Sequence, residues 1–411
     1  MNLHSTSPSR TDLRTASRLN GIGVSPIAKL TMDAFTLRSE GREVIALNAG
    51  EPDFDTPSNI VEAAIHAMRG GQTRYTALDG TRQLKLAVQS KFWRENRLDF
   101  ALEEIIVGAG SKMILFNALM ATLNPGDEVI LGTPYWTTYA DIIALCAGVT
   151  VRVECAETDG FRMTAQALER AITSRTRWVV LNSPSNPSGA VYSIEDYRPV
   201  LDVLLRNPHV WLLCDDIYEH IVYDGAEFVT AAQLEPALRS RTLTVNGVSK
   251  AYAMTGWRLG YGAGPKALIE AMTVVQSQST SCASSIAQAA AVEALSGPQD
   301  SVRSRCRQFQ HRRDLLIPLL NEIDGITCEM PAGAFYAYPN CSKLIGRHTP
   351  NGTRLESDAD FCHYLLHVHG VAAVPGSAFG LSPYFRLSYA SSDAEIVAGA
   401  RRIAQACALL E

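Results

Sequence analysis

Residues 242–258 read TLTVNGVSKAYAMTGWR and join an apolar strand to a lysine. The first four of them, Thr242-Leu243-Thr244-Val245, have the composition of a strand buried on both faces. The segment after Lys250 is marked by glycine and aromatic residues and differs from a plain solvated helix. A lysine that loses its hydration here has a lowered pKa and becomes nucleophilic. Taken alone, a lysine after a strand is more often a surface residue.

Similar strands precede this one in the chain. They are expected at 104–107, 128–131, 150–153, 177–181 and 210–213, and helical patterns such as 112–123 separate them. Strands that are apolar on both faces and alternate with helices are typical of a mostly parallel sheet covered by helices. The sequence therefore predicts an α/β fold whose ligand binds beyond the carboxyl ends of the strands.

The length of 411 residues predicts more than one domain, because a single core stops growing at roughly 250–300 residues. After about residue 300 the pattern changes to a charged helix, 303–320, followed by short strands and a final helix. We expect residues 56–298 to form a large domain. Residues 1–55 together with 299–411 are expected to form a smaller α+β domain.

The composition argues against several classes of partner. Charged residues make up 19% of the chain and the formal net charge is −5, so the chain has no basic field to hold nucleic acid or an anionic membrane. Nine cysteines, without a C-x-x-C pair, disfavour a disulfide framework or a zinc ribbon. No apolar run approaches the roughly 18 residues of a membrane span. We expect a cytoplasmic protein with small-molecule partners.

The N-terminal 18 residues are rich in Ser, Thr and Arg and contain one acid, Asp12. This composition faintly resembles an organelle transit peptide, but it lacks the apolar core of a secretory signal. We interpret the segment as a disordered or loosely docked tail.

Glycine-rich and polar segments follow several of the predicted strands. Gly108-Ala109-Gly110-Ser111 precedes a helix, whose first N–H groups suit a phosphate, whereas the third glycine of a dinucleotide site is missing. In 182–189, NSPSNPSG, two prolines and a glycine define a rigid turn that directs an asparagine amide at a ligand or is an ordinary turn. Asp215 ends an apolar strand, where it either caps the next helix or meets a buried cation.

The combination of these segments resembles the class I and II aminotransferases of pyridoxal-phosphate (PLP) fold type I, within them the aspartate aminotransferase-like group. The resemblance extends from about Gly21 to the C-terminus. Its strongest marks are SKAYAMTGWR at 249–258, NPSG at 186–189, DDIY at 215–218 and FRLSY at 385–389. It implies a mostly parallel seven-stranded sheet between helices in a large PLP-binding domain, plus a smaller α+β domain.

The resemblance also implies a role for each residue that matches a family motif. Lys250 would hold PLP as an internal aldimine and then move a proton as general base and acid. Asp215 would pair with the pyridinium nitrogen, which keeps the ring protonated. Tyr218 and Asn186 would hydrogen-bond the phenolic oxygen of the ring, and Trp136 would stack on the ring face.

The implied phosphate site includes residues from both ends of the large domain. Its members are Gly110, Ser111, Lys112 and Arg258. Tyr75 matches a tyrosine that family members lend to the phosphate of the neighbouring subunit, which implies a homodimer. Many relatives have a phosphate-binding serine at the position of Gly247, so one phosphate contact is lost here.

The implied substrate site is centred on Arg386, whose planar guanidinium would bind the substrate α-carboxylate in a bidentate manner. Gly50 would contribute a backbone contact, and Asn186 and Trp136 would lie beside the substrate. Lys112 would face the distal carboxylate of a dicarboxylic substrate or, alternatively, only the phosphate. The segment 21–29 would form part of a lid that excludes water.

The function that the resemblance implies is PLP-dependent, ping-pong transfer of an amino group from an L-amino acid to a 2-oxo acid such as 2-oxoglutarate. Aspartate or another dicarboxylate is the expected donor. Aromatic amino acids, prephenate or basic amino acids remain alternatives, as does a β-eliminating lyase. A sensor fused to a DNA-binding module is disfavoured, since no helix-turn-helix module fits before Gly21.

Two other groups of residues are interpreted without a catalytic metal. His363, His367 and His369 with Asp358 and Asp360 have a spacing compatible with metal binding, but a helix with surface histidines explains them better. Asp215 and Asp216 together suggest a two-carboxylate hydrolase. Adjacent strand residues point to opposite faces, however, so only one of them is expected to reach the site.

Overall fold

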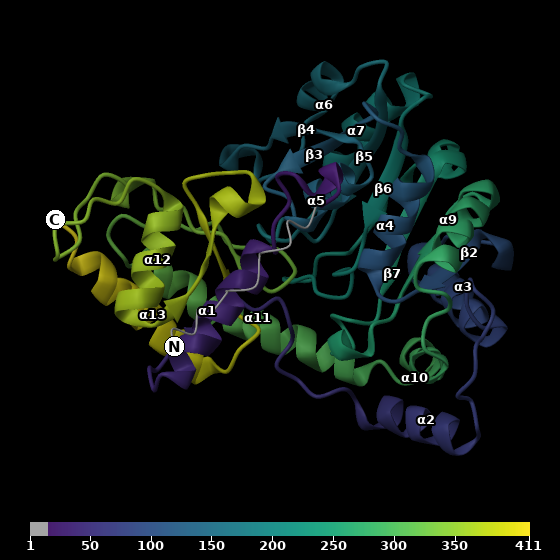
Figure 1. The fold of residues 1–411 in the computed structure, drawn as a ribbon, viewed down its shortest axis with the longest axis horizontal. Coiled ribbons are helices and arrows are strands. Elements are labelled where there is room, and N and C mark those ends of the chain that lie inside the picture. Colours follow the sequence, from purple (N-terminus) through teal and green to yellow (C-terminus); the bar gives the residue numbers. More distant parts are fainter. Residues whose placement is uncertain (1–14) are drawn as a thin grey trace, which may run out of the picture.

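The structure, a computed structural model, describes residues 15–411 and is built around a seven-stranded sheet (Figure 1). The strand order is β2-β8-β7-β6-β5-β3-β4. The strands are β2 Ile105–Gly108, β3 Glu128–Thr133, β4 Val149–Glu154, β5 Thr176–Asn182, β6 Trp211–Asp215, β7 Thr242–Gly247 and β8 Gly260–Ala263. All neighbouring pairs are parallel except those that involve β8. The predicted mostly parallel sheet of the α/β class is confirmed.

The seventh strand, β8, has no counterpart among the strands expected from the apolar pattern. It runs antiparallel between β2 and β7 and reads GYGA, so only Tyr261 supplies a large side chain. Glycine at position 260 is required by packing, because a Cβ there would overlap the backbone of Ser111. A strand selected for close backbone approach lacks the β-branched composition by which the other strands are identified.

Helices cover both faces of the sheet. They are α2 Ser58–Arg69, α3 Arg82–Asn96, α4 Ser111–Thr122, α5 Thr138–Leu145, α6 Ala165–Ala171, α7 Ile194–Arg206, α8 Ala231–Leu234, α9 Lys266–Gln278 and α10 Ser285–Ser296. Alternate strand residues enter different cores: Val129 and Leu131 pack with α4, α5 and α9, while Ile130 packs with α6 and α7. This period of two creates the three layers of the fold.

A second group of elements lies beside the large sheet (Figure 1). It comprises α1 Pro26–Ser39, α11 Asp300–Asn321, α12 Asp358–His369, α13 Asp393–Ala408 and the strands β1 Ile45–Ala46, β9 Tyr336–Ala337, β10 Val371–Ala372, β11 Val374–Pro375 and β12 Phe385–Ser388. β11, β12 and β9 form an antiparallel sheet, and β1 pairs in parallel with β10. The β1–β10 pair places the N-terminal segment against elements of the C-terminal region.

Two further features of the chain were expected from composition. All nine cysteines are free thiols, and most of them are buried. Among residues 15–411, no helix combines the length and the apolar composition that crossing a bilayer requires. The predicted tail at 1–18 lies largely outside the described residues.

Candidate active site

A cavity of about 460 Å³ lies at the carboxyl ends of the parallel strands. Asn182 ends β5, Asp215 ends β6, and Ser111 begins α4, so three separate elements deliver polar groups to one place. Most of the predicted site residues line this cavity: Gly50, Ser111, Lys112, Trp136, Asn186, Asp215, Tyr218, Lys250, Arg258 and Arg386. The cavity is therefore the candidate active site.

Asp215 is a buried acid without a cationic partner in the described part of the chain. Its Oδ2 accepts a 2.5 Å hydrogen bond from the hydroxyl of Tyr139, and the backbone N–H of Ile217 lies 3.4 Å from Oδ1. Burial raises the pKa of Asp215 to about 6, although these hydrogen bonds and the charge of Lys250 act in the opposite direction. A protonated ligand nitrogen would supply the positive charge that this carboxylate lacks.

Asp216 follows immediately but does not line the cavity. Its side chain is buried, and within residues 15–411 neither carboxylate oxygen has a hydrogen-bond partner. Burial raises its pKa well above the ordinary range. The two adjacent acids therefore have separate environments, and of the two, Asp215 faces the cavity.

Lys250 lies three residues beyond the end of β7, and its Nζ donates a 2.6 Å hydrogen bond to the carbonyl oxygen of Gly50. The ammonium lies 5.9 Å from the centre of the Tyr218 ring. Burial, together with the nearby charge of Arg386, lowers the pKa of Lys250 to about 8. At pH 7 roughly a tenth of the amine is then neutral, far more than for an ordinary lysine, and the neutral amine is the form that acts as nucleophile or general base.

The N-terminus of α4 forms an anion-binding cradle. Gly110 caps this helix with φ of 91°, a conformation that favours glycine. The first N–H groups of a helix have no intrahelical acceptor and point toward its N-terminal end. Arg258 approaches Gly110 closely and is held by a 2.7 Å hydrogen bond from Nη1 to the carbonyl oxygen of Thr255. Helix N–H groups and a guanidinium together suit a phosphate.

The structure gives a physical reason for Gly247, the position at which many relatives have a serine. A Cβ at Gly247 would lie 2.6 Å from Oγ of Ser111 and 3.1 Å from Cδ1 of Ile217. The Ser111 hydroxyl donates a 2.8 Å hydrogen bond to the carbonyl oxygen of Asn246, which fixes it in this space. Ser111 therefore occupies the room that a side chain at position 247 would need.

Arg386 is a fully buried cation. Its Nη1 donates a 3.0 Å hydrogen bond to Oδ1 of Asn186, and its Nη2 donates a 2.6 Å bond to the carbonyl oxygen of Asn48. Nε is buried and has no acceptor among the described residues. The guanidinium lies 4.6 Å from the centre of the Tyr336 ring. An unpaired buried donor on a cavity-lining cation is a site for a carboxylate ligand.

Lys112 provides a second cation in the cavity lining. Its Nζ lies 4.9 Å from the centre of the Trp136 ring, and Trp136 meets Tyr139 edge to face at 5.3 Å. Burial and the positive charge of Arg258 lower the pKa of Lys112, while Asp141 acts in the opposite direction. Lys112 lies close enough to Arg258 for the two charges to interact. Its position is therefore compatible with both predicted roles, at the phosphate and at a distal carboxylate.

Two predicted site residues lie outside the cavity lining. Gly110 lies at the start of α4 in contact with Arg258, since a Cβ at Gly110 would overlap Nη2 of Arg258. Tyr75 is 91% exposed, an unusual degree of exposure for a tyrosine. Within one chain it serves no evident packing purpose.

Two tyrosines in the site were missed by the sequence analysis. Tyr139 bonds Asp215, and the hydroxyl of Tyr336 lies 2.7 Å from that of Tyr218 while its ring faces Arg386. Tyr139 lies on α5 and Tyr336 on β9, far from the glycine-rich segments in sequence. No local pattern marks either residue, since only the tertiary fold brings them to the cavity.

A comparison with family models matches residues 42–403 to "Aminotransferase class I and II". The chain belongs to this family. The match spans every strand of the three sheets and all of the cavity lining from Ala49 onward, and the family is PLP-dependent. The chain is therefore a transaminase with PLP as its cofactor.

The aminotransferase is similar over nearly its whole length to characterised relatives. It is 62% identical to the aspartate aminotransferase of Rhizobium meliloti (strain 1021), over 95% of this chain and 96% of that protein. A crystal structure of the aspartate aminotransferase from Rhizobium meliloti has a TM-score of 0.95 and 61% identity, covering 97% and 100% of the two chains. The Thermus thermophilus aspartate aminotransferase with maleate has a TM-score of 0.88 and 39% identity, covering 96% and 100%.

The cavity of this aminotransferase fits PLP by its own chemistry. Lys250 is a desolvated amine, Asp215 is a buried carboxylate with no ion-pair partner among residues 15–411, and the start of α4 presents N–H groups that have no intrahelical acceptor. These are the groups needed for a carbonyl carbon, a ring nitrogen and a phosphate.

The five residues considered for metal binding have separate environments outside the aminotransferase site. Asp358 accepts hydrogen bonds from the Ser377 N–H and the Ser382 hydroxyl, and Asp360 accepts one from Ser357. The rings of His363 and His367 lie 4.1 Å apart on one face of α12, whereas His369 bonds Tyr364. The structure does not bring these histidines and aspartates together.

Proposed function

We propose that this aminotransferase takes the amino group of L-aspartate, or of another dicarboxylic amino acid, and passes it to a 2-oxo acid such as 2-oxoglutarate by a ping-pong mechanism. The observation that carries the proposal is that the cavity lining holds two cations, Arg386 and Lys112, in addition to Lys250 and Arg258, which have cofactor roles. A dicarboxylic substrate has one carboxylate for each. The relatives named aspartate aminotransferase and the maleate in the Thermus structure support the same class of substrate.

Bound PLP supplies the carbonyl carbon that accepts the amino group and a ring that withdraws electrons from the substrate Cα. Lys250 Nζ, with its pKa lowered to about 8, would be the base that removes the Cα proton and, once protonated, the acid that delivers a proton to the cofactor carbon C4'. Arg386 orients the substrate through its α-carboxylate, with Gly50 contributing a backbone contact. Asp215, in the cavity lining, would provide the negative charge that pairs with the protonated ring nitrogen of PLP.

The other lining residues hold the cofactor in this proposal. Tyr218 and Asn186 hydrogen-bond the phenolic oxygen, and Trp136, which with Asn186 also borders the substrate, stacks on the ring. The phosphate is bound by Gly110, Ser111, Lys112 and Arg258. Each role predicts weaker PLP binding when the side chain is removed.

The two regions of the chain have different tasks in this proposal. Residues 56–298 form the domain that binds PLP, and residues 1–55 with 299–411 form the small domain and lid. Ser25 and, on α1, Ile27, Ala28 and Thr31 line the cavity, which supports a lid role for the segment 21–29 and the rest of α1, which begins at Pro26 within that segment. Closure of such a lid excludes water from the reacting groups.

We also propose that the enzyme is a cytoplasmic homodimer in which Tyr75 reaches the phosphate of the neighbouring subunit. Its 91% exposure supports a partner outside its own chain. The test is to co-express a Tyr75→Ala chain with a Lys250→Ala chain, each inactive alone. Mixed dimers should regain one intact site. Absence of any regained activity in isolated mixed dimers would contradict the shared site.

The substrate proposal is tested by the absorbance of the purified holoenzyme before and after addition of single amino acids. We expect aspartate and glutamate to convert the cofactor to its amino form at far lower concentrations than phenylalanine, tyrosine or lysine. Conversion by aromatic or basic amino acids alone would show that the donor is an aromatic or basic amino acid and not a dicarboxylic one. Prephenate would then be tested as acceptor. Release of ammonia with a 2-oxo acid and without an acceptor would indicate a β-eliminating lyase.

A further inference from the structure

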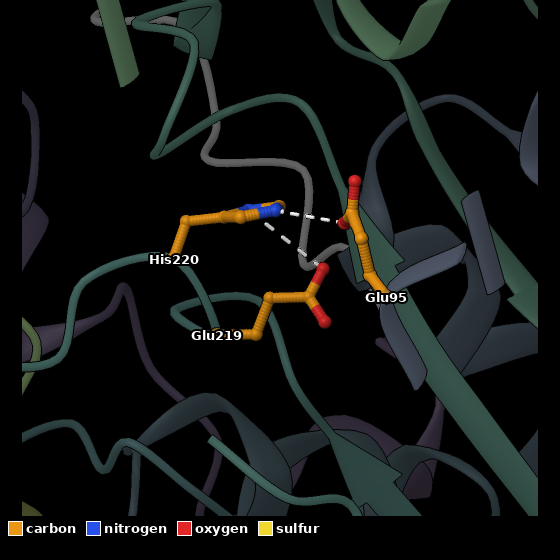
Figure 2. A group of neighbouring side chains, drawn as sticks. All are labelled: Glu95, Glu219 and His220. Atoms are coloured by element: carbon orange, nitrogen blue, oxygen red, sulfur yellow. Dashed lines mark hydrogen bonds and ion pairs between the residues drawn. The ribbon is translucent and has the colours of Figure 1, made fainter. Parts of the chain in front are cut away.

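Three residues with metal-ligand side chains meet behind the active site: Glu95, Glu219 and His220 (Figure 2). His220 Nε2 lies 2.9 Å from Oε2 of Glu95, and His220 Nδ1 lies 3.7 Å from Oε1 of Glu219. Two carboxylates and an imidazole at these distances match the ligand types of a divalent cation site. The neighbouring side chains decide whether the group needs one.

Lys91 supplies the positive charge of this cluster. It is fully buried, its Nζ forms an ion pair with Glu219, and Nζ lies 3.6 Å from Oε2 of Glu95. Burial opposes ionisation of Glu219, yet Lys91 keeps the pKa of that carboxyl below its usual range. The ammonium occupies the place of a cation between the two acids, so the cluster is an internal ion-pair network and not a metal site.

Glu219 also accepts hydrogen bonds from two buried asparagines. Asn96 Nδ2 donates at 2.9 Å to Oε2, and Asn246 Nδ2 donates at 2.8 Å to Oε1. Asn96 Oδ1 in turn accepts a 2.7 Å hydrogen bond from Lys91. The carboxylate thus connects α3, the loop after β6 and the end of β7 in one network.

Both segments that Glu219 holds carry active-site groups. On its own loop, Asp215 and Tyr218 line the cavity, while Glu219 points away from it toward α3. On β7, Oδ1 of Asn246 accepts a 2.7 Å hydrogen bond from the Gly247 N–H, and its carbonyl oxygen accepts the Ser111 hydroxyl. A displacement of Asn246 would therefore reach Ser111 directly.

We propose that Glu219, charged and paired with Lys91, is a positioning residue that fixes the cofactor cradle by clamping Asn246, and through it Ser111, to the loop that carries Asp215 and Tyr218. A carboxylate is the group that satisfies this position, because three donors converge on its two oxygens. Glutamine would offer one acceptor and turn an NH₂ group toward a donor. The proposal rests on the phosphate-binding role of Ser111 proposed above.

The test compares Glu219→Gln with Glu128→Gln. Glu128 is an acid on β3 with a similarly small exposed fraction that is paired with Arg175 and hydrogen-bonded by Thr173, outside the cavity lining. Three quantities are measured: the urea midpoint, the dissociation constant of PLP from the apoenzyme, and the ³¹P chemical shift of bound PLP. We expect both variants to lose stability. Only Glu219→Gln should raise the dissociation constant, by tenfold or more, and move the ³¹P resonance.

An unchanged dissociation constant and ³¹P shift in Glu219→Gln would overturn the proposal. If that variant fails to fold, the double variant Lys91→Met with Glu219→Met decides, since it removes both buried charges together and leaves none unpaired. In the double variant a raised constant supports positioning and an unchanged one refutes it. Ser111→Ala is measured in parallel. If this variant leaves the ³¹P chemical shift of bound PLP unchanged, the phosphate-binding role of Ser111 is itself contradicted, whatever Glu219→Gln shows.

Discussion

The hydroxyl of Tyr139 donates a 2.5 Å hydrogen bond to Oδ2 of Asp215, although the two residues lie 76 positions apart in the chain. Both side chains are buried, and burial raises the pKa of Tyr139 well above its ordinary value. Tyr139 therefore remains a neutral donor across the physiological range. Its hydrogen bond favours the ionised form of an acid that burial would otherwise keep protonated.

Removal of this donor by Tyr139→Phe should raise the pKa of Asp215 further. A hydrogen bond to a charged group contributes about 1.5–3 kcal/mol, and one pKa unit corresponds to about 1.4 kcal/mol, so we expect a rise of about one to two units. The acid limb of the pH dependence of PLP affinity should move upward by that amount. Tyr135→Phe, on a nearby buried tyrosine, serves as the control. Coincident profiles for the two variants would contradict the coupling.

The raised pKa of Asp215 predicts that the acid destabilises the apoenzyme above acidic pH. Its pKa is about 6 in the folded chain against an ordinary value of 3.8, so the stability it contributes is complete below about pH 4 and is lost as pH rises through 6. Asp215→Asn should therefore stabilise the apoenzyme by about 3 kcal/mol at pH 8 and by little at pH 4. Urea unfolding at both values measures the difference, and an equal effect at both would refute the assignment.

The lowered pKa of Lys250 predicts how the apoenzyme captures PLP. The neutral amine is the nucleophile, so the association rate should rise about tenfold per pH unit below about 8 and level off above it. Arg386→Met removes a positive charge and should move the midpoint to higher pH. Arg175→Met, on an exposed arginine at the opposite end of the sheet, should leave it in place. Stopped-flow absorbance gives the rates, and a flat profile from pH 7 to 9.5 would contradict the prediction.

The position of Lys112 in the cavity predicts a substrate-selective effect. Lys112→Met should lower kcat/KM for L-aspartate by about 10- to 100-fold, the range expected for a charge-assisted hydrogen bond. Activity with L-alanine, which has no distal carboxylate, should change little. Steady-state kinetics with both donors measures the ratio. An equal loss for both would assign Lys112 to the phosphate alone.

The space around Gly247 predicts that the serine found in many relatives is harmful here. In Gly247→Ser the new Cβ would lie 2.6 Å from Oγ of Ser111, so we expect weaker PLP binding by about tenfold. The double variant Gly247→Ser with Ser111→Gly relieves this overlap and should bind PLP as well as Ser111→Gly alone does. Fluorescence titration of the apoenzymes measures both constants. If the single variant binds PLP as well as the wild type, the packing argument fails.

Several of the strands that the sequence predicts share one property. They are apolar on both faces, as at 177–181, and such runs need helices above and below whatever their order in the sheet. The glycine-rich strand β8, Gly260–Ala263, was not predicted because it is selected for close contact with Ser111 rather than for side-chain burial. The local composition of a segment indicates whether its side chains are buried. It does not indicate which other backbone segment packs against it.

Some active-site residues could likewise be predicted from the sequence, whereas others could not. Lys250, Asp215 and Arg386 stand at strand ends or in recognisable motifs, so the sequence alone indicates the class of cofactor chemistry and a carboxylate ligand. Tyr139, Tyr336 and the Lys91–Glu219 pair carry no local signal, because each acts through a partner far away in the chain. Residue type and motif spacing determined the chemistry of this protein. Only the tertiary structure decided which buried groups set the pKa and position of the catalytic residues, since desolvation and hydrogen bonding depend on distances that the sequence does not contain.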